Sequence, residues 1–204
     1  MIFDRKRFFD AYRLAFPGKL VVEQVRGLQD ILEAMEADAD LTDIRWAAYM
    51  LATVKHECDN TYQPIVERGP RSYFDKYEPN TPKGKRLGNK VMGDGYRTRG
   101  RGYVMLTGLD NYLRMNRLLG LAGTEDDIVA DPDKAMKPSI AYRIMSLGMR
   151  RGVFTGKKLS DYIMGERCDY PGARAIINLR DRAALIAGYA AHFETILKNA
   201  EVRT

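Results

Sequence analysis

Apolar side chains recur at helical spacing along the first third of the chain. Residues 4–16 and residues 21–37 each carry an apolar side chain at every third or fourth position, which places these side chains on one helix face. The positions are Phe8, Tyr12 and Phe16 in the first segment, and Val21, Val25, Leu28, Leu32 and Met35 in the second. A third helix is predicted from a cap at Asp40 or Thr42 to about residue 58.

The pattern changes between residues 59 and 108. Seven of the eighteen glycines of the chain lie between residues 84 and 108. The segment also carries four prolines, at positions 64, 70, 79 and 82. Glycine and proline at this density are typical of loops and short strands, and we expect the best strand at residues 101–107, RGYVMLT.

Helical spacing returns after residue 108, in segments 109–120, 138–152 and 180–199. On the last segment we expect one buried face, made of Leu185, Tyr189, His192 or Phe193, and Ile196. The pattern predicts a mainly α protein with an irregular, glycine-rich middle. A length of 204 residues fits one domain, which can have two lobes.

The positive charge of the chain is unevenly distributed. The whole sequence has a net charge of +6, and residues 83–102 alone hold seven Lys or Arg and one Asp, also a net +6. Such a segment favours a polyanionic partner, namely nucleic acid, an anionic membrane or an acidic cell-wall polymer. A solvated basic loop explains the charge equally well. No recognition-helix or RNP-type motif accompanies it, so we expect no specific nucleic-acid partner.

Composition and motifs exclude several classes of protein. The hydrophobic content of 45% with 29% charged residues is typical of a soluble globular chain, and no apolar run is long enough to span a bilayer. The N-terminus is too charged for a signal peptide, so we expect a cytoplasmic protein. Cys58 and Cys168 lack metal-type spacing and are expected to be buried free thiols. We expect no metal and no cofactor.

Two glutamates are candidates for chemistry. Glu57 ends the third predicted helix on the face of Met50 and Val54, where apolar surroundings and the helix dipole disfavour an anion. The protonated form, which a general acid needs, is favoured there. Glu67 follows in a proline-containing loop. Both glutamates could also be ordinary solvated residues, Glu57 with Lys55 or Arg68 as a partner, and spacing alone does not decide between the readings.

Four longer stretches resemble glycoside hydrolase family 19, the family of chitinases and phage endolysins. They are AAYMLATVKHE with TYQPIVE, then YRTRGRGYVMLTGLDNY at 96–112, the segment from DPDKAMKPSIAY to SDYI, and GARAIINLRDRAALIAGY. The likeness runs from about residue 8 to 195 and is closest to the bacterial and prophage branch. It implies a lysozyme-like, two-lobed α+β fold, with residues 1–204 as a single catalytic domain.

The resemblance assigns roles to individual residues. Glu57 matches the general acid, Glu67 the general base that activates water, and Thr107 the hydroxyl that holds this water. An inverting mechanism of this kind needs its carboxyl groups about 6.5–9.5 Å apart. The positions that match substrate contacts, or that brace the acid, are His56, Tyr96, Arg101, Tyr103, Asn111 and Asn178.

Some of these positions have structural alternatives. Tyr103 and Tyr112 could be core aromatics, and Arg101 could order its loop rather than contact sugar. Arg182 is a candidate partner for a buried acid, Glu57 in particular. The sequence also departs from the family pattern, with Met105 in place of a glutamine, Leu179-Arg180 in place of small residues, and Thr98-Arg99 before the glycine of the GRG motif.

The resemblance implies an endolysin that hydrolyses the β-1,4 bonds of peptidoglycan as an N-acetylmuramidase. Such an enzyme would wait in the host cytoplasm as a monomer until a holin opens the membrane. Alternatives are a chitinase, a lytic transglycosylase, a toxin delivered between bacteria, and a non-catalytic wall-binding or phage structural protein that keeps the fold.

Overall fold

The computed structural model describes residues 1–178 and 180–202, and its fold is mainly α-helical, as predicted. The α-helices are α1 (Arg5–Ala15), α2 (Val22–Ala37), α3 (Ile44–Glu57), α4 (Pro82–Arg86), α5 (Asp94–Arg97), α6 (Leu109–Leu118), α7 (Pro138–Arg151), α8 (Tyr170–Ala173) and α9 (Ala183–Ala200). Short 3-10 helices are η1 (Arg71–Tyr77), η2 (Pro132–Met136), η3 (Leu159–Asp161) and η4 (Arg174–Ile176). Two antiparallel strand pairs complete the list, β1 (Ile65–Val66) with β2 (Arg101–Gly102), and β3 (Ile163–Met164) with β4 (Arg167–Cys168).

The chain divides into two compact units. Residues 1–63 together with 149–202 form the first unit, and residues 64–148 form the second. None of the described helices is long and apolar enough to cross a membrane. Among the described residues there is also no group of three or more His, Cys, Asp or Glu side chains that could hold a metal ion.

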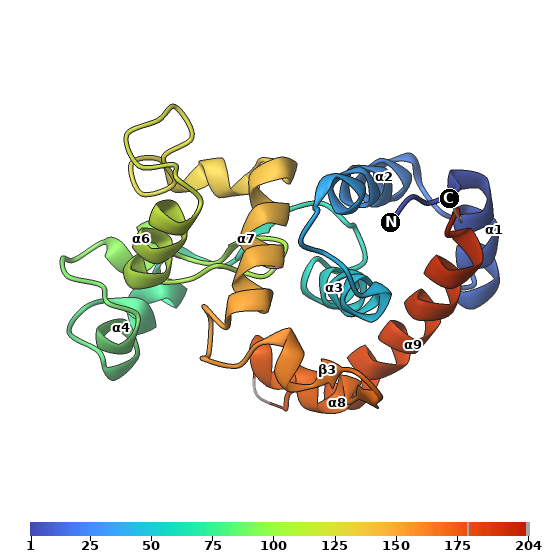
Figure 1. The fold of residues 1–204 in the computed structure, drawn as a ribbon. Coiled ribbons are helices and arrows are strands. Elements are labelled where there is room, and N and C mark those ends of the chain that lie inside the picture. Colours follow the sequence, from blue (N-terminus) through green and yellow to red (C-terminus); the bar gives the residue numbers. More distant parts are fainter. Residues whose placement is uncertain (179, 203–204) are drawn as a thin grey trace. The chain divides into compact units, whose positions relative to one another are not determined.

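The core of the first unit forms where α9 packs against α3 and α1 (Figure 1). The residues of α3 from Ala47 to Val54 are buried on every side. On α9 the buried positions are spaced three or four residues apart: Ile186, Ala190, Phe193, Ile196, Leu197 and Ala200. The predicted face was therefore wrong at Leu185, which is 42% exposed, and of the two alternatives His192 and Phe193 it is Phe193 that is buried. The buried face of α9 begins at Ile186, one residue after Leu185.

Two predicted helix starts differ from the structure. Neither Asp40 nor Thr42 caps α3, because the carboxylate of Asp43 accepts the amide of Arg45 and begins the helix at Ile44. The last helix begins at Ala183 and not at residue 180, because Arg182 has a left-handed backbone with φ of 56°. A residue in that conformation cannot belong to a right-handed helix.

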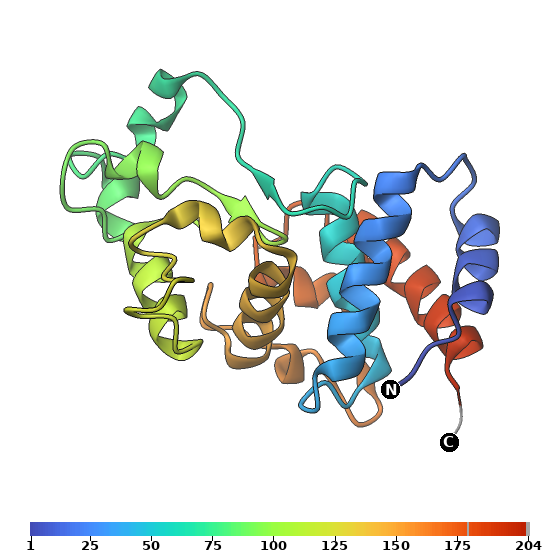
Figure 2. The ribbon, with the colours of Figure 1, turned by 90° about the horizontal axis from the view of Figure 1, so that it is seen from above.

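The middle segment contains more helix and less strand than predicted. Its loops include the one-turn and two-turn helices η1, α4 and α5, and the strand expected at 101–107 is only two residues long. Positive φ angles at Gly102 (82°) and Met105 (52°) turn the chain back, so that Leu106 pairs with Arg101. The result is a tight turn beside the β1–β2 pair (Figure 2).

The two cysteines are not joined by a disulfide, as expected, but only Cys58 is buried. Cys168 lies on β4 and is exposed. The prediction of two buried thiols was therefore wrong for Cys168, because a two-residue strand at the surface has no layer above it.

Lys55 of α3 lies among aromatic rings contributed by α1, α9 and the loop after α3. Its Nζ atom is 4.3 Å from the ring centre of Phe16 and 5.2 Å from that of Tyr189. The ammonium group also donates to the side chain of Asn60. Burial lowers the pKa of Lys55 to about 8 from its ordinary 10.5.

This lowered pKa predicts a pH-dependent stability. The folded state releases the Lys55 proton near pH 8 and the unfolded state near pH 10.5, so the contribution of Lys55 to the free energy of unfolding should rise between these values. After discounting for solvent screening, we expect a gain on the order of 1 kcal/mol relative to Lys55→Met, which lacks the ionisable group. Urea denaturation of both proteins from pH 7 to 10 measures it, and parallel pH profiles would contradict the expectation. Above pH 10 buried tyrosines such as Tyr12, whose pKa is raised by burial, act in the opposite direction.

Candidate active site

The residues that sequence analysis selected lie in both units. Glu57, His56 and Asn178 belong to the first unit, and the remaining six belong to the second: Glu67, Tyr96, Arg101, Tyr103, Thr107 and Asn111.

Glu57 is the last residue of α3, and its side chain is 15% exposed. The helix stops there because the next residues take left-handed conformations, with φ of 49° at Asp59 and 62° at Asn60. The hydroxyl of Thr61 donates to the carbonyl of Cys58 and fixes this exit from the helix. The carboxylate of Glu57 is thus held on a rigid helix end.

Arg174 is the partner of Glu57. Its guanidinium donates to Oε1 of Glu57 at 2.6 Å, and its Nε donates to the carbonyl of Asp181 at 2.8 Å. The Arg174 side chain is only 1% exposed. The partners considered from sequence, Lys55, Arg68 and Arg182, were therefore wrong: Arg182 is exposed in the turn before α9. The Glu57 carboxylate is thus held by a buried guanidinium of its own unit.

Asn178 lies in the turn that carries Arg174. Its backbone amide donates to the carbonyl of Arg174, and its carbonyl accepts the amide of Asp181. The side chain of Asn178 is exposed, whereas that of His56, next to Glu57, is half-buried. The departure at Leu179-Arg180 falls on this turn, and Leu179 lies outside the described residues.

Glu67 immediately follows strand β1. Gly100, the residue before strand β2, binds both its backbone and its side chain. Its amide donates to the carbonyl of Gly100, and its Oε2 accepts the amide of the same glycine at 3.1 Å. The other carboxylate oxygen accepts the hydroxyl of Tyr77 at 2.9 Å. Lys76 Nζ is 3.9 Å away, at the limit of an ion pair. Glu67 is thereby fixed as an acceptor by two neutral donors.

Tyr77 lies at the end of η1 and is buried. Burial, together with its hydrogen bond to Glu67, raises the pKa of Tyr77, so the phenol stays protonated and can donate. Nothing in the sequence pattern pointed to this residue. An aromatic residue ten positions after a loop glutamate has no spacing signal.

Thr107 follows the tight turn after β2. Its hydroxyl donates to the carbonyl of Met105 at 2.7 Å, which leaves the oxygen able to accept a hydrogen bond from a water. Its own carbonyl accepts the side-chain amide of Asn111, in the first turn of α6. Met105 also lies close to Gly100: a Cβ placed on Gly100 would meet the Met105 sulfur at 3.1 Å and Glu67 at 3.2 Å. A side chain at this position would therefore press against Met105 and Glu67, and both would have to shift by a few tenths of an ångström.

Arg101 and Tyr103 are buried, with exposed fractions of 4% and 1%. The Arg101 guanidinium binds Asp133 at 2.7 Å and donates to the carbonyls of Arg97 and Arg99. It therefore orders the loop, which is the structural alternative considered for it. Tyr103, like Tyr112, has the burial of a core aromatic.

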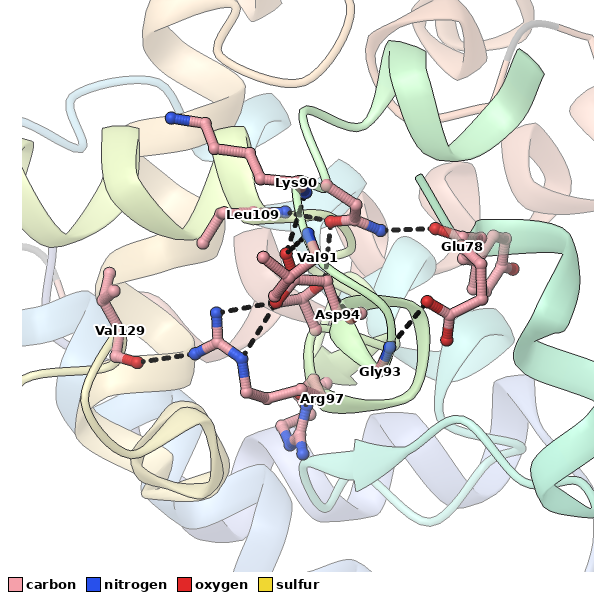
Figure 3. A network of polar contacts seen from close by, with 12 residues as sticks. Glu78, Lys90, Val91, Gly93, Asp94, Arg97, Leu109 and Val129 are labelled. Carbon is pink, nitrogen blue, oxygen red and sulfur yellow. Dashed lines mark hydrogen bonds and ion pairs between the residues drawn. The ribbon is translucent and has the colours of Figure 1, made fainter. Parts of the chain in front are cut away.

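A network of polar contacts fixes the loop between α4 and α5 (Figure 3). Asp94 accepts the amides of Lys90 and Val91, and these bonds lower its pKa although burial opposes them. The buried carboxylate of Glu78 accepts the amide of Gly93 at 2.7 Å. The guanidinium of Arg97 donates to the carboxylate of Asp94 and to the carbonyl of Val129. The loop that leads into α5, the helix that carries Tyr96, is therefore held rigidly within the second unit.

The two glutamates differ in their surroundings. Glu57 faces a buried guanidinium, whereas Glu67 accepts from a phenol and a backbone amide. Carboxylates in different environments can take the separate parts of acid and base, as glycoside hydrolysis requires.

Comparison with known proteins finds a relative by sequence and similar solved structures. A glycosyl hydrolase family 19 domain-containing protein of Haemophilus influenzae is 37% identical over 148 residues, which cover 61% of this chain and 74% of the relative. The fold matches chitinase C from Streptomyces griseus with a TM-score of 0.56 at 19% identity, over 98% of this chain and 95% of that one. A mutant of chitinase C matches with the same TM-score and coverage at 18% identity. No protein-family model matches the chain. On the strength of the Haemophilus relative, the chain belongs to glycosyl hydrolase family 19 and is a glycoside hydrolase with a chitinase-like fold.

Proposed function

We propose that the protein is an endolysin that hydrolyses the β-1,4 bond between N-acetylmuramic acid and N-acetylglucosamine in peptidoglycan. The observation that carries the proposal is the hydrogen-bonded cradle of Glu67, in which Tyr77 and Gly100 hold a carboxylate as a proton acceptor. The basic segment 83–102, with a net charge of +6, suits an acidic cell wall better than neutral chitin. In this role the protein acts as a monomer and reaches the wall after a holin opens the membrane.

The chemistry assigns one step to each glutamate. Protonated Glu57 gives its proton to the glycosidic oxygen as the bond to the anomeric carbon breaks. A water held by Thr107 attacks this carbon, and Glu67 takes the proton of the water. The product has an inverted anomeric configuration. Arg174 stabilises the carboxylate that Glu57 becomes, and a new proton from solvent restores the acid.

Digestion of purified murein tests this function. We expect new reducing ends on N-acetylmuramic acid, each product heavier than a 1,6-anhydro fragment by one water, and an α-anomer as the first product. Reducing ends on N-acetylglucosamine would overturn the choice of bond. A digest with no new reducing ends at all would overturn the endolysin itself.

A chitinase is the second candidate, favoured by the match of the fold to chitinase C. Chitin has the same β-1,4 backbone of N-acetylated sugars but lacks the acidic stem peptides. Parallel assays on chitin oligosaccharides distinguish the two. Faster hydrolysis of the chitin oligosaccharide than of murein would favour the chitinase. A lytic transglycosylase needs a single acid and would leave 1,6-anhydro ends.

Tyr77→Phe should lower kcat by about tenfold and leave KM nearly unchanged. The phenol is a positioning residue that contacts Glu67 and not the substrate in this proposal. A hydrogen bond to a charged group contributes about 1.5–3 kcal/mol, and 1.4 kcal/mol corresponds to a tenfold change in rate. Steady-state kinetics on murein or a soluble glycan fragment measure both constants.

The matched control is Tyr73→Phe, in the same 3-10 helix but 46% exposed. It should leave both constants unchanged. If Tyr77→Phe raised KM with kcat unchanged, the contact would serve substrate binding rather than the orientation of Glu67.

A further inference from the structure

A cavity of about 570 Å³ lies entirely within the second unit, beside the short helix α5 that carries Tyr96. Its lining includes four arginines, at positions 71, 97, 99 and 101, and three aspartates, at positions 94, 131 and 133. The volume is in the range of sites for small ligands. The roles assigned to the two glutamates do not use this cavity.

Two of the four arginines are neutralised within the protein. Arg97 pairs with Asp94 at 3.1 Å, and Arg101 pairs with Asp133 at 2.7 Å. Arg71 and Arg99 belong to none of the ion pairs found among the described residues. Asp131, the third aspartate of the lining, caps η2 by accepting the amide of Asp133. Its negative charge offsets one of the two positive charges of Arg71 and Arg99. The cavity keeps a surplus of positive charge.

The ring of Tyr96 positions both free guanidinium groups. The Arg99 group is centred 4.0 Å from the ring centre and the Arg71 group 4.9 Å from it. One nitrogen of Arg99 also donates to the carbonyl of Tyr96 at 2.8 Å. A guanidinium has five N–H donors, so each arginine keeps donors for a planar, two-oxygen acceptor. Stacking on the ring holds these donors in place before a ligand arrives.

The cavity is connected to Glu67 through the chain. Arg99 and Arg101 flank Gly100, whose amide and carbonyl both bond to Glu67. A ligand held by Arg99 is therefore bound one residue from the backbone that orients the proposed base.

We propose that Arg71, Arg99 and Tyr96 form a subsite for a carboxylate of the peptidoglycan stem peptide. The identity of this ligand rests on the proposed function, whereas the recognition of a carboxylate rests on the cavity itself. Chitin has no carboxylate, so this subsite would distinguish the two polymers.

Binding of N-acetylmuramyl dipeptide tests the subsite without turnover. Wild-type protein should bind this compound about tenfold more tightly than the same compound with its carboxylate converted to an amide, as measured by calorimetry at low salt. Arg71→Gln with Arg99→Gln should remove this difference and leave binding of the amide unchanged. Arg99→Lys should retain part of the difference, because the charge remains and the two-donor geometry is lost.

The control is the pair Lys85→Gln with Arg86→Gln, which removes two exposed charges from the same basic segment outside the cavity. It should keep the preference for the carboxylate. If the control loses the preference as much as the arginine pair does, the effect is one of net charge and the subsite is overturned. Thermal melts of all variants verify folding. Should Arg99→Gln fail to fold, Arg71→Gln alone carries the test, because its side chain is exposed.

The two proposals fail separately. Arginine-dependent binding of the acid with no cleavage of murein would overturn the endolysin and keep the carboxylate subsite. Cleavage of murein, with equal binding of acid and amide, would overturn the subsite and keep the endolysin.

Discussion

Glu57→Gln is expected to lower the rate of glycan hydrolysis by about 10²–10⁴-fold, the usual contribution of a general acid. An amide cannot give a proton to the glycosidic oxygen. The fold should survive, because the side-chain oxygen of glutamine can still accept from Arg174, which is now 2.6 Å from Oε1 of the glutamate. Release of reducing ends from murein measures the rate, and a variant with the wild-type rate would overturn the role of Glu57.

The control is Glu166→Gln, an exposed glutamate between β3 and β4, which should leave the rate unchanged.

The leaving group of the substrate distinguishes the role of the acid from that of the base. A glycoside with a good leaving group, such as dinitrophenol, needs no proton, so Glu57→Gln should regain most of its rate on it. Glu67→Gln should stay slow on both substrates, because water must still be activated. Equal behaviour of the two variants would contradict their separate roles.

Arg174→Met should lower the free energy of unfolding by about 3–5 kcal/mol, the typical cost of breaking a buried ion pair from one side. The Arg174 side chain is 1% exposed, and Glu57, which would lose its partner, is 15% exposed. The carbonyl of Asp181 would lose a donor as well. Urea denaturation followed by circular dichroism measures the change, and a loss below 0.5 kcal/mol, the range of ordinary surface substitutions, would contradict it.

Arg182→Met is the matched control, since it removes an exposed arginine from the same turn. It should change the free energy of unfolding by no more than about 0.5 kcal/mol.

A double-mutant cycle isolates the Arg174–Glu57 pair. In the Glu57→Gln background, Arg174→Met should lower the free energy of unfolding by less than it does in the wild type. We expect a coupling of about 0.5–3 kcal/mol, because no carboxylate is left unpaired. Additive costs would mean that Arg174 stabilises the turn and not Glu57.

The long helices are the elements that the sequence pattern predicted best. The spacing of apolar residues predicted α1, α2, α3, α6, α7 and α9, and the resemblance to family 19 was confirmed by the Haemophilus relative and the chitinase fold. Helical periodicity is a local property, since residues three and four apart share a face whatever lies opposite. The glycine-rich middle lacked such a signal. Its short helices depend on caps such as Thr81, and on glycines such as Gly84 and Gly95 that admit a close neighbour.

The sequence by itself determined the family, the helical class and the glutamates that the catalytic proposal uses. The tertiary structure decided which groups surround them. Arg174 and Arg182 are eight positions apart in one basic stretch, and only the fold of the turn buries the first beside Glu57, 117 residues away, and leaves the second in solvent. Tyr77 reaches Glu67 for the same reason. Burial and pairing are set by contacts between distant segments, and no local pattern of residue types records them.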